Sequence, residues 1–349
     1  MASTYLTRTM GTPTDATKQT LSVWLKFSAN SDYGGLVSSQ YNSDTSGAGH
    51  FSGDNESIYS LWTYNGSGNQ ETRVSAKGRD FSGWYHIVST QDASQSGTDK
   101  SKIWINGVLQ TEFANDQRSN FSTHANWFAN GKTLYIGSRY SQTLFFNGTM
   151  SHLHLCDGYA YQASDFGSFD STTGEWKINT SPNVNYGNEG FFILKDNNFT
   201  VGGGTLTKSE DCPSNIFCTL NPLDKPAGAV MKLSHGNTTL GDSGGNDGDM
   251  ALRGTIGAKT GKYYWEVKNY SHGTLCVAKT NLHMVQNMTT SSPTSGIWGV
   301  QSAGNGTINS YNNGTFSNSN SFTDWSSGDI ISMALDLDNG KLFFGVNGT

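Results

Sequence analysis

Residues 328–348 read Gly-Asp-Ile-Ile-Ser-Met-Ala-Leu-Asp-Leu-Asp-Asn-Gly-Lys-Leu-Phe-Phe-Gly-Val-Asn-Gly, which predicts a β-hairpin. The Asn-Gly pair at 339–340 tolerates the positive φ angles of a two-residue type I′ turn. Such a turn places Asp338 opposite Lys341, in an exposed ion pair worth about a few tenths of a kcal/mol. It also predicts three apolar cross-strand pairs, Leu337 with Leu342, Leu335 with Phe344 and Met333 with Val346. One face of the hairpin is therefore expected to be core.

A second Asn-Gly pair, at 347–348, predicts another turn one residue before the sequence stops. An unpaired apolar strand edge invites aggregation. We therefore expect the natural polypeptide to continue beyond Thr349, so that the C-terminal domain is incomplete in this sequence. The alternative is a neighbouring chain that covers the open edge.

The composition favours short strands joined by tight turns. The chain has 349 residues, of which 42 are Gly, 6 are Pro and 14% are charged. Its 9 Trp, 15 Tyr and 18 Phe supply large buried areas, so a hydrophobic content of 34% still supports packed cores. A chain of this length is expected to form about two domains.

Charge and hydropathy exclude several classes of protein. The net charge of −6 disfavours a binder of duplex nucleic acid, which needs a basic stripe. No apolar stretch approaches the ~20 residues of a membrane span, and residues 1–11 lack the apolar core of a signal peptide. We therefore expect no membrane insertion and no Sec-type export. The 4 cysteines are irregularly spaced and are expected to be reduced thiols.

Alternating apolar residues predict strands along the first half of the chain. Residues 20–28 alternate, with one face formed by Leu21, Val23, Leu25 and Phe27 and the other by Ser22, Trp24 and Lys26. Residues 101–113 predict a hairpin that turns at Asn106-Gly107 and pairs Ile105 with Val108 and Trp104 with Leu109. Further strands are predicted at 58–64, 84–90, 134–137 and 148–156, with a turn at 65–66 and a polar loop at 31–53.

Five short motifs follow one another along the first 150 residues. They are Thr-Leu-Ser-Val-Trp-Leu (20–25), Gly-Trp-Tyr-His-Ile-Val (83–88), Ile-Trp-Ile-Asn-Gly (103–107), Leu-Tyr-Ile-Gly (134–137) and Phe-Asn-Gly-Thr-Met (146–150). In this order they resemble the concanavalin A-like, laminin G-like jelly roll over about residues 1–160. The segment 165–192, with Asp-Phe-Gly, Gly-Glu-Trp and Gly-Phe-Phe, resembles the extension that follows this domain in virion-associated proteins of marine tailed bacteriophages.

The second half resembles an SPRY domain. Its motifs are Gly-Lys-Tyr-Tyr-Trp-Glu-Val (261–267), Ile-Trp-Gly-Val (297–300) and the hairpin at 328–348. In the first motif, Tyr264 and Glu266 are expected on one face of a strand. The fold class predicted for the whole chain is all-β, with two β-sandwich (jelly-roll) domains in tandem. The expected bounds are 1–200 for the first domain with its extension, 201–226 for a connection and 227–349 for the SPRY-like domain.

The sequence does not predict catalysis. A jelly-roll glycoside hydrolase needs two carboxylates at a fixed separation, commonly from a Glu-x-Asp-x-x-Glu run. No such run occurs, and Glu175 and Glu189 stand alone in turn-like contexts. Ser, His and Asp are all present, but no Gly-x-Ser-x-Gly elbow is expected that places a serine on a strand-to-helix turn. We therefore expect a protein that is not an enzyme.

Two patterns could bind a metal. His152 and His154 alternate on one strand and could share an ion, although no third ligand is in view. Asp242, Asp247 and Asp249 lie in an oxygen-rich loop of the kind that calcium can organise, without the spacing of an EF-hand. Imidazoles on a sheet face and a solvated turn are the simpler interpretations, so no cofactor is expected.

Binding through aromatic side chains is the preferred function class, because sandwich folds leave recognition to loops and strand ends. The candidate ligand-binding residues are Trp62, Tyr64, Trp127, Tyr140, Tyr311 and Trp325, with Tyr41 as a further aromatic of the same kind. Each of them could instead be a core side chain. The SPRY resemblance implies a ligand surface made of loops around Trp298, Tyr311 and Trp325.

The family resemblance implies a non-catalytic virion protein that serves as a tail fibre, an appendage or a capsid decoration. We expect it on the virion surface after synthesis in the host cytoplasm, bound to other virion proteins and to a host glycan or receptor. A homo-oligomer, for example a trimer, would multiply weak contacts. The alternatives are a jelly-roll glycoside hydrolase that acts on host polysaccharide and a cellular SPRY module that binds peptides.

Overall fold

The computed structural model divides the chain into two compact units, Met1–Leu223 with Met231–Asp242 and Asp224–Val230 with Ser243–Thr349. The regular structure of the described residues is mainly β-strand, with one α-helix of four residues and short 3-10 helices, so the all-β prediction is confirmed. Every strand pairing among these residues is antiparallel apart from an isolated bridge. The structure describes residues 3–28, 34–40, 47–52, 56–64, 68–124, 128, 131–194, 200–206, 208–224, 232–241, 252–269, 273–279, 295–302, 308–319 and 324–349.

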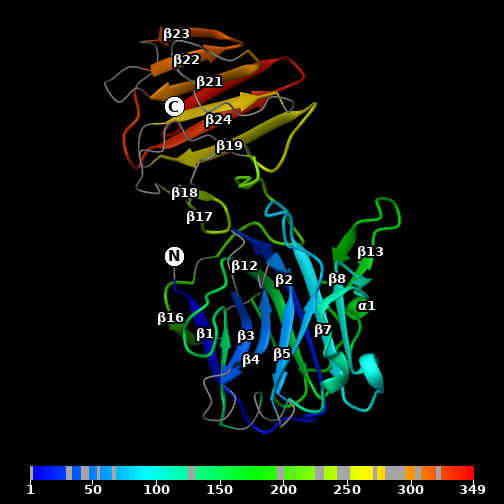
Figure 1. The fold of residues 1–349 in the computed structure, drawn as a ribbon. Helices are drawn as coiled ribbons and strands as arrows, with labels where there is room; N and C mark the ends of the chain where they lie inside the picture. The colour runs from blue at the N-terminus through cyan, green and yellow to red at the C-terminus, as the bar shows by residue number, and fades with distance from the viewer. Residues whose placement is uncertain are drawn as a thin grey trace. The chain divides into compact units, whose positions relative to one another are not determined.

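Two large sheets form most of the first unit (Figure 1). The eight-stranded sheet has the order β10 (Phe113–Asn115), β6 (Asn69–Val74), β5 (Ser60–Tyr64), β4 (Gly47–Ser52), β3 (Gly34–Gln40), β11 (Thr133–Ile136), β1 (Tyr5–Thr9) and β16 (Thr200–Gly203). The six-stranded sheet has the order β15 (Phe191–Ile193), β12 (Gly148–Asp157), β2 (Lys18–Phe27), β7 (Tyr85–Asp92), β8 (Ser101–Ile105) and β9 (Val108–Leu109). Short 3-10 helices lie at Gly97–Lys100 and Arg118–Asn120.

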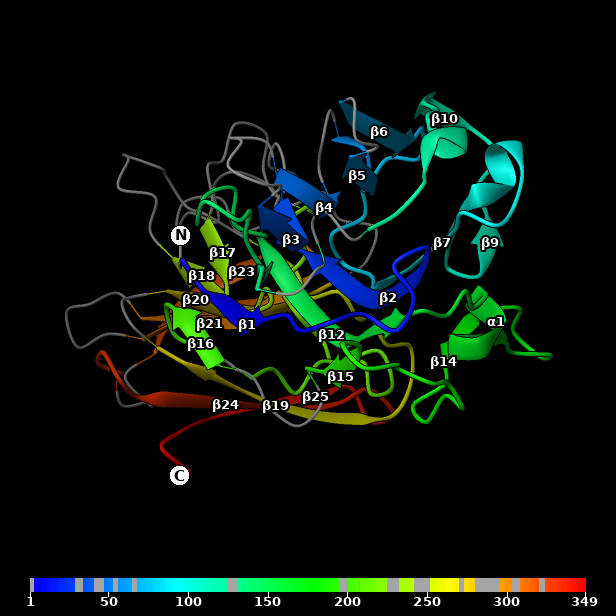
Figure 2. The same cartoon turned by 90° about the horizontal axis from the view of Figure 1, so that it is seen from below.

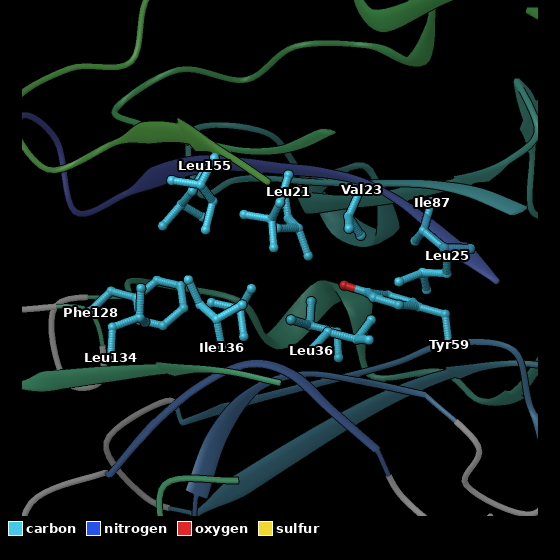
Figure 3. Close-up of a cluster of buried hydrophobic side chains, with 14 of the residues drawn as sticks. Leu21, Val23, Leu25, Leu36, Tyr59, Ile87, Phe128, Leu134, Ile136 and Leu155 are labelled. Atoms are coloured by element: carbon cyan, nitrogen blue, oxygen red, sulfur yellow. The ribbon is translucent and has the colours of Figure 1, made fainter. Parts of the chain in front are cut away.

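The main core lies between these two sheets. Figure 3 shows Leu21, Val23 and Leu25 of β2 on one side of it, facing side chains from the eight-stranded sheet. The facing residues include Leu36 and Ile136, and all five side chains are at most 2% exposed. The period-two alternation predicted for residues 20–28 therefore places the expected residues in the core.

The other face of β2 is buried as well, because a second layer covers it. That layer comes from α1 (Ala163–Phe166) and the hairpin β13 (Gly167–Phe169) and β14 (Trp176–Ile178), together with neighbouring loop residues. The His86 ring stacks on Trp24 at a centroid distance of 4.6 Å, and the Trp176 indole donates to His86 Nδ1 at 2.9 Å. Burial lowers the pKa of His86 to about 3, so this imidazole is neutral and can accept that hydrogen bond.

Most of the predicted connection at 201–226, as far as Leu223, is part of the first unit. Lys26 is 1% exposed, and its ammonium donates to Asp211 at 2.9 Å and to Thr219 at 2.8 Å. The Trp84 indole donates to the same Asp211 oxygen at 3.1 Å. A buried ammonium needs a paired charge and further hydrogen bonds, and this segment supplies both. β16 also comes from this stretch and pairs with β1.

A short hairpin further along the chain also belongs to the first unit. β17 (Lys232–Ser234) and β18 (Thr239–Gly241) enclose Asn237, which is fully buried. Its amide donates to the backbone oxygens of Phe27 and Phe81, at 3.3 and 3.2 Å. The second unit therefore takes most of its chain from residue 243 onwards, and not from residue 227 as predicted.

The polar loop predicted at 31–53 is wrong, because β3 and β4 occupy much of it. Strand formation here depends on small residues. A Cβ atom on Gly35 would lie 2.2 Å from the carbonyl carbon of Ser138, so only glycine fits beneath that backbone. The Ser38 hydroxyl, fully buried, donates to Ser138 O at 2.9 Å. The strand is thus covered by backbone on one face, which a hydropathy pattern does not reveal.

Two predicted Asn-Gly turns are confirmed. Asn106 and Gly107 have φ angles of 47° and 77°, and the predicted pairs of β8 and β9 form. Asn347 and Gly348 have φ angles of 52° and 83°, and Val346 and Thr349 exchange backbone hydrogen bonds across them. The turn predicted at 65–66 lies outside the described residues.

The second unit contains a three-stranded and a four-stranded sheet. The first has the order β19 (Lys262–Lys268), β24 (Ile330–Asp336) and β25 (Lys341–Val346), which run alongside one another in Figure 2. The second has the order β20 (Thr274–Ala278), β21 (Ile297–Ser302), β22 (Ile308–Asn312) and β23 (Thr315–Ser319). The core of the second unit is small and is built on Val300, Ile308, Trp325 and Ile331.

The hairpin of β24 and β25 has a different register from the predicted one. Asp336, not Asp338, faces Lys341, and Met333 faces Phe344. The Asp336 carboxylate accepts from the backbone and side-chain amides of Asn339, at 3.1 and 2.9 Å, which stabilises a four-residue loop. The two-residue turn is therefore wrong. Because the shift is two residues, the apolar side chains still share one face, as predicted.

Candidate functional site

Trp62, one of the ligand-binding residues predicted from the sequence, lies on the outer face of the eight-stranded sheet. Trp62 on β5 faces Glu71 on β6 and Gly49 on β4. Its neighbours Leu61 and Thr63 are buried, which fixes the indole on the outer face of the strand. Gly49 has no side chain, so the cross-strand neighbours of the indole are a glycine on one side and a carboxylate on the other.

Polar side chains surround that carboxylate. Glu71 accepts from Asn115 at 3.0 Å and from the Ser60 hydroxyl at 3.4 Å, and it lies 3.5 Å from the Arg73 guanidinium. The side chains of Glu71 and Arg73 are 15% and 19% exposed, so they are held in place yet reachable. We call Ser60, Trp62, Glu71, Arg73 and Asn115 the β5–β6 cluster.

The β5–β6 cluster has a defined chemistry. The indole offers a flat apolar face, the carboxylate accepts hydrogen bonds, and the guanidinium and amide donate them. Glu71, Arg73 and Asn115 were missed in the sequence, although Trp62 was found. The signal that could have found them is strand position, because Glu71 and Arg73 lie on β6 next to β5 and Asn115 lies on β10 next to β6.

Two further predicted residues lie on the first unit. Tyr64 is half-buried on the same face of β5 as Trp62. Tyr140 is half-buried, and the Arg139 guanidinium lies 5.2 Å from its ring centroid. The hydrogen bond from Ser38 to Ser138 ties the start of this loop to the outer face of β3. Trp127 and Tyr41 lie outside the described residues.

The other two predicted residues are core side chains of the second unit. Tyr311 is 5% exposed and donates to Gln301 at 2.8 Å. Trp325 is 4% exposed and packs with Val300 and Ile308. Burial leaves neither ring a free face for a ligand, which corrects their assignment as ligand-binding residues. Trp298 is half-buried on β21.

The two histidines of β12 are buried beside the same ring. His152 and His154 lie 5.8 and 4.0 Å from the Phe192 centroid, although β12 is irregular between Ser151 and His154. His154 also shares a hydrogen bond with the Tyr186 hydroxyl at 2.8 Å. Within the described ranges, no three His, Cys, Asp or Glu side chains are grouped to hold a metal. Asp242, Asp247 and Asp249 lie outside those ranges.

The carboxylates that were weighed for hydrolysis have basic partners. Glu175 pairs with Lys177 at 2.5 Å, and Glu189 lies 3.5 Å from Arg8. All four cysteines are free thiols, and burial raises the pKa of Cys276 to about 11. In the part of the chain that the structure describes, no helix has the length and apolarity to cross a membrane.

Comparison with known families identifies the first fold. Residues 2–165 match the family model of the concanavalin A-like lectin/glucanases superfamily. This match and the two packed antiparallel sheets are those of a jelly-roll, lectin-like fold. The β5–β6 cluster lies on the outer face of this jelly roll, within the matched residues. None of the curated proteins that were compared with the chain matches it.

Several solved structures are similar at low identity. A heptameric SAP-like pentraxin from Limulus polyphemus is 18% identical, with a TM-score of 0.36, and the match covers 58% of this chain and 89% of that one. A putative carbohydrate-binding protein from Bacteroides ovatus is 15% identical, with a TM-score of 0.33 and coverages of 61% and 60%. Domains LG4-5 of the mouse laminin alpha1 chain are 8% identical, with a TM-score of 0.34 and coverages of 99% and 73%. All three TM-scores lie below 0.5, so these structures do not establish a shared fold or function.

Proposed function

We propose that this protein is a non-catalytic adhesion protein that binds a host-surface glycan through the β5–β6 cluster. The observation that carries the proposal is the pairing of Trp62 with Glu71 on one face of the jelly roll, with Arg73 and Asn115 beside the carboxylate. A sugar presents C–H groups on the faces of its ring and hydroxyls around the edge. An indole next to a charged and amide-bearing rim complements both.

The existing contacts within the cluster favour a hydroxylated ligand. Glu71 is held by Arg73 and Asn115, so its position does not depend on the ligand. A carboxylate has about four lone-pair sites and a guanidinium has five N–H donors, so the rim combines acceptors with donors. Hydroxyls can both accept and donate, and they therefore suit such a mixed rim.

Trp62→Ala tests the proposal. We expect it to lower affinity for a binding polysaccharide at least about tenfold, because a central aromatic anchor is worth about 2 kcal/mol or more. The probe is an immobilised panel of algal and bacterial polysaccharides, read by biolayer interferometry. Phe217→Ala is the matched control, because Phe217 is an aromatic residue of the same unit and is 44% exposed. Equal binding by both variants, or no binding by the wild type, would exclude the cluster as a glycan site.

A glycoside hydrolase is the second candidate, because the matching family model includes glucanases. Hydrolysis needs a second carboxylate about 5–9.5 Å from the first. Glu71 is the one carboxylate of the β5–β6 cluster, and its contacts with Arg73 and Asn115 suit binding rather than proton transfer. Incubation of the polysaccharide panel with wild type and Glu71→Gln separates the two. Release of reducing ends by the wild type, lost in the variant, would favour the enzyme.

We infer further that the protein is displayed on the virion of a marine tailed phage, as a fibre, an appendage or a capsid decoration. The support is the ordered set of jelly-roll motifs followed by the extension at 165–192 and the SPRY-like motifs. Immunogold labelling of purified virions tests this location, and unlabelled particles would contradict it. The SPRY assignment and a homo-oligomer such as a trimer remain predictions, and light scattering of the purified chain tests the latter.

A further inference from the structure

An exposed pair of aromatic rings lies on the outer face of the three-stranded sheet in the second unit. Tyr264 on β19 faces Ala334 on β24, which in turn faces Phe343 on β25. Tyr264 is 64% exposed and Phe343 is 56% exposed. The residues on alternate positions, Met333 and Ile331, are 1% exposed, so this row points away from the core.

The row forms a slot rather than a flat patch. Ala334 is small and lies between the two rings, and neighbouring strands are about 4.8 Å apart, so the backbones of Tyr264 and Phe343 are separated by about 10 Å. Both rings line an open groove of about 330 Å³ that has Ala334 in its floor. This volume lies at the lower end of the range of small-molecule sites, about 300–1,000 Å³.

Polar groups border the slot at both ends. At one end, Lys262 and Asp336 form an ion pair at 3.2 Å, and Lys341 faces Asp336 across the hairpin. At the other end, the Tyr264 hydroxyl donates to Glu266 at 2.6 Å. That hydrogen bond raises the pKa of Tyr264, so the hydroxyl keeps its proton near neutral pH.

The charges at this border select the class of ligand. The four charges next to the slot cancel, and Lys268, beyond Glu266 on the same face, adds one positive charge, which is far short of the basic patch that a phosphate-rich ligand needs. It offers flat apolar walls together with donors and acceptors at both ends. A neutral sugar has apolar ring faces and hydroxyl edges, and it complements each of these features.

We propose that this slot is a second carbohydrate-binding site, which takes the pyranose rings of a neutral glycan over Ala334 between Tyr264 and Phe343. The site belongs to the second unit and shares no residue with the β5–β6 cluster. It therefore goes beyond the proposed function and does not depend on it. With both sites, a single chain would hold a glycan surface at two points, and avidity would follow from effective concentration.

The test uses the full chain carrying Trp62→Ala, so that failure of the first site cannot hide or imitate the second. Cellohexaose, maltohexaose and chitohexaose are titrated by isothermal calorimetry. We expect at least one of them to bind and its affinity to fall at least about tenfold with Tyr264→Ala or Phe343→Ala, as for aromatic anchors. Ala334→Leu keeps both rings but fills the floor, so it is expected to weaken binding as well.

Ile256→Ala is the matched control, because Ile256 is an apolar residue of the same unit and is 53% exposed. Thermal unfolding checks that each variant folds. Binding that survives Tyr264→Ala and Phe343→Ala would overturn the proposal, as would the absence of binding by all three sugars. If the chain instead self-associates and both aromatic variants are monomeric, the face is an interface between copies and the proposal is wrong.

Discussion

Lys26→Met is expected to destabilise the first unit strongly, because it leaves Asp211 buried without its cation. The Lys26 ammonium is 2.9 Å from Asp211, and the two side chains are 1% and 3% exposed. Removing one partner of a buried ion pair typically costs about 3–5 kcal/mol. The Trp84 indole and the Phe217 amide still donate to the remaining carboxylate. We therefore expect a loss near the lower end of that range, about 3 kcal/mol.

Native-state hydrogen exchange measures this loss in the first unit alone. Amides of β2 and β7 lie in its centre and report the free energy of its global opening. The control is Lys102→Met, because the ion pair of Lys102 with Asp99 spans 3.4 Å and its side chains are 41% and 65% exposed. That variant is expected to change stability by no more than about 0.5 kcal/mol.

A double variant separates the buried charge from lost packing. Asp211→Asn in the Lys26→Met background removes the uncompensated charge and keeps one acceptor oxygen for the Phe217 amide. We expect it to recover about 2 kcal/mol. If Lys26→Met and Lys102→Met differ by less than about 1 kcal/mol, the reasoning from burial is refuted.

Two further predictions concern the first unit. Gly107→Ala is expected to lower the free energy of unfolding in urea by about 2–4 kcal/mol, because φ is 77° and the new Cβ would lie 2.3 Å from the Trp176 ring. The control is Gly97→Ala, where φ is 54° and the new Cβ has open space, so the expected loss is only about 1 kcal/mol. Equal losses in the two variants would contradict the clash with Trp176. Burial lowers the pKa of His50 and His86 to about 3 in the folded protein, whereas the unfolded value is about 6.5. Each histidine therefore adds stability that is complete above pH 6.5 and is lost as the pH falls from 6.5 towards 3. Urea unfolding between pH 6.5 and 4.5 should show that the free energy of unfolding falls by about 1.4 kcal/mol per pH unit for each histidine. A free energy of unfolding that does not change with pH would refute this.

The strand pattern of the first unit was largely predictable from the sequence, because strong local signals set it. Asn106-Gly107 fixed both the turn and the register of its hairpin. At Asn339-Gly340 the same dipeptide predicted the wrong turn length, because the Asp336 carboxylate accepts a hydrogen bond from Asn339 and stabilises a longer loop. A dipeptide favours a turn, but a nearby hydrogen-bonding side chain can change its length.

The composition of the β5–β6 cluster was not predictable, because it also depends on the register of a hairpin. A two-residue turn at 65–66 would place Trp62 opposite Asn69. The structure pairs Tyr64 with Asn69, which shifts the register by two residues and brings Glu71 opposite Trp62. Long-range contacts were further out of reach: Lys26 and Asp211 are 185 residues apart, and nothing in either local sequence indicates the other.

The double burial of β2 has a consequence for how the jelly roll can be isolated. The family model ends at residue 165, but Trp176 and Asp211 lie beyond that point and cover His86 and Lys26. A fragment cut at the family boundary would expose a stacked indole, a neutral imidazole and a lone ammonium on one sheet face. The segment that matches the family model is therefore smaller than the compact unit whose side chains bury β2 on both faces.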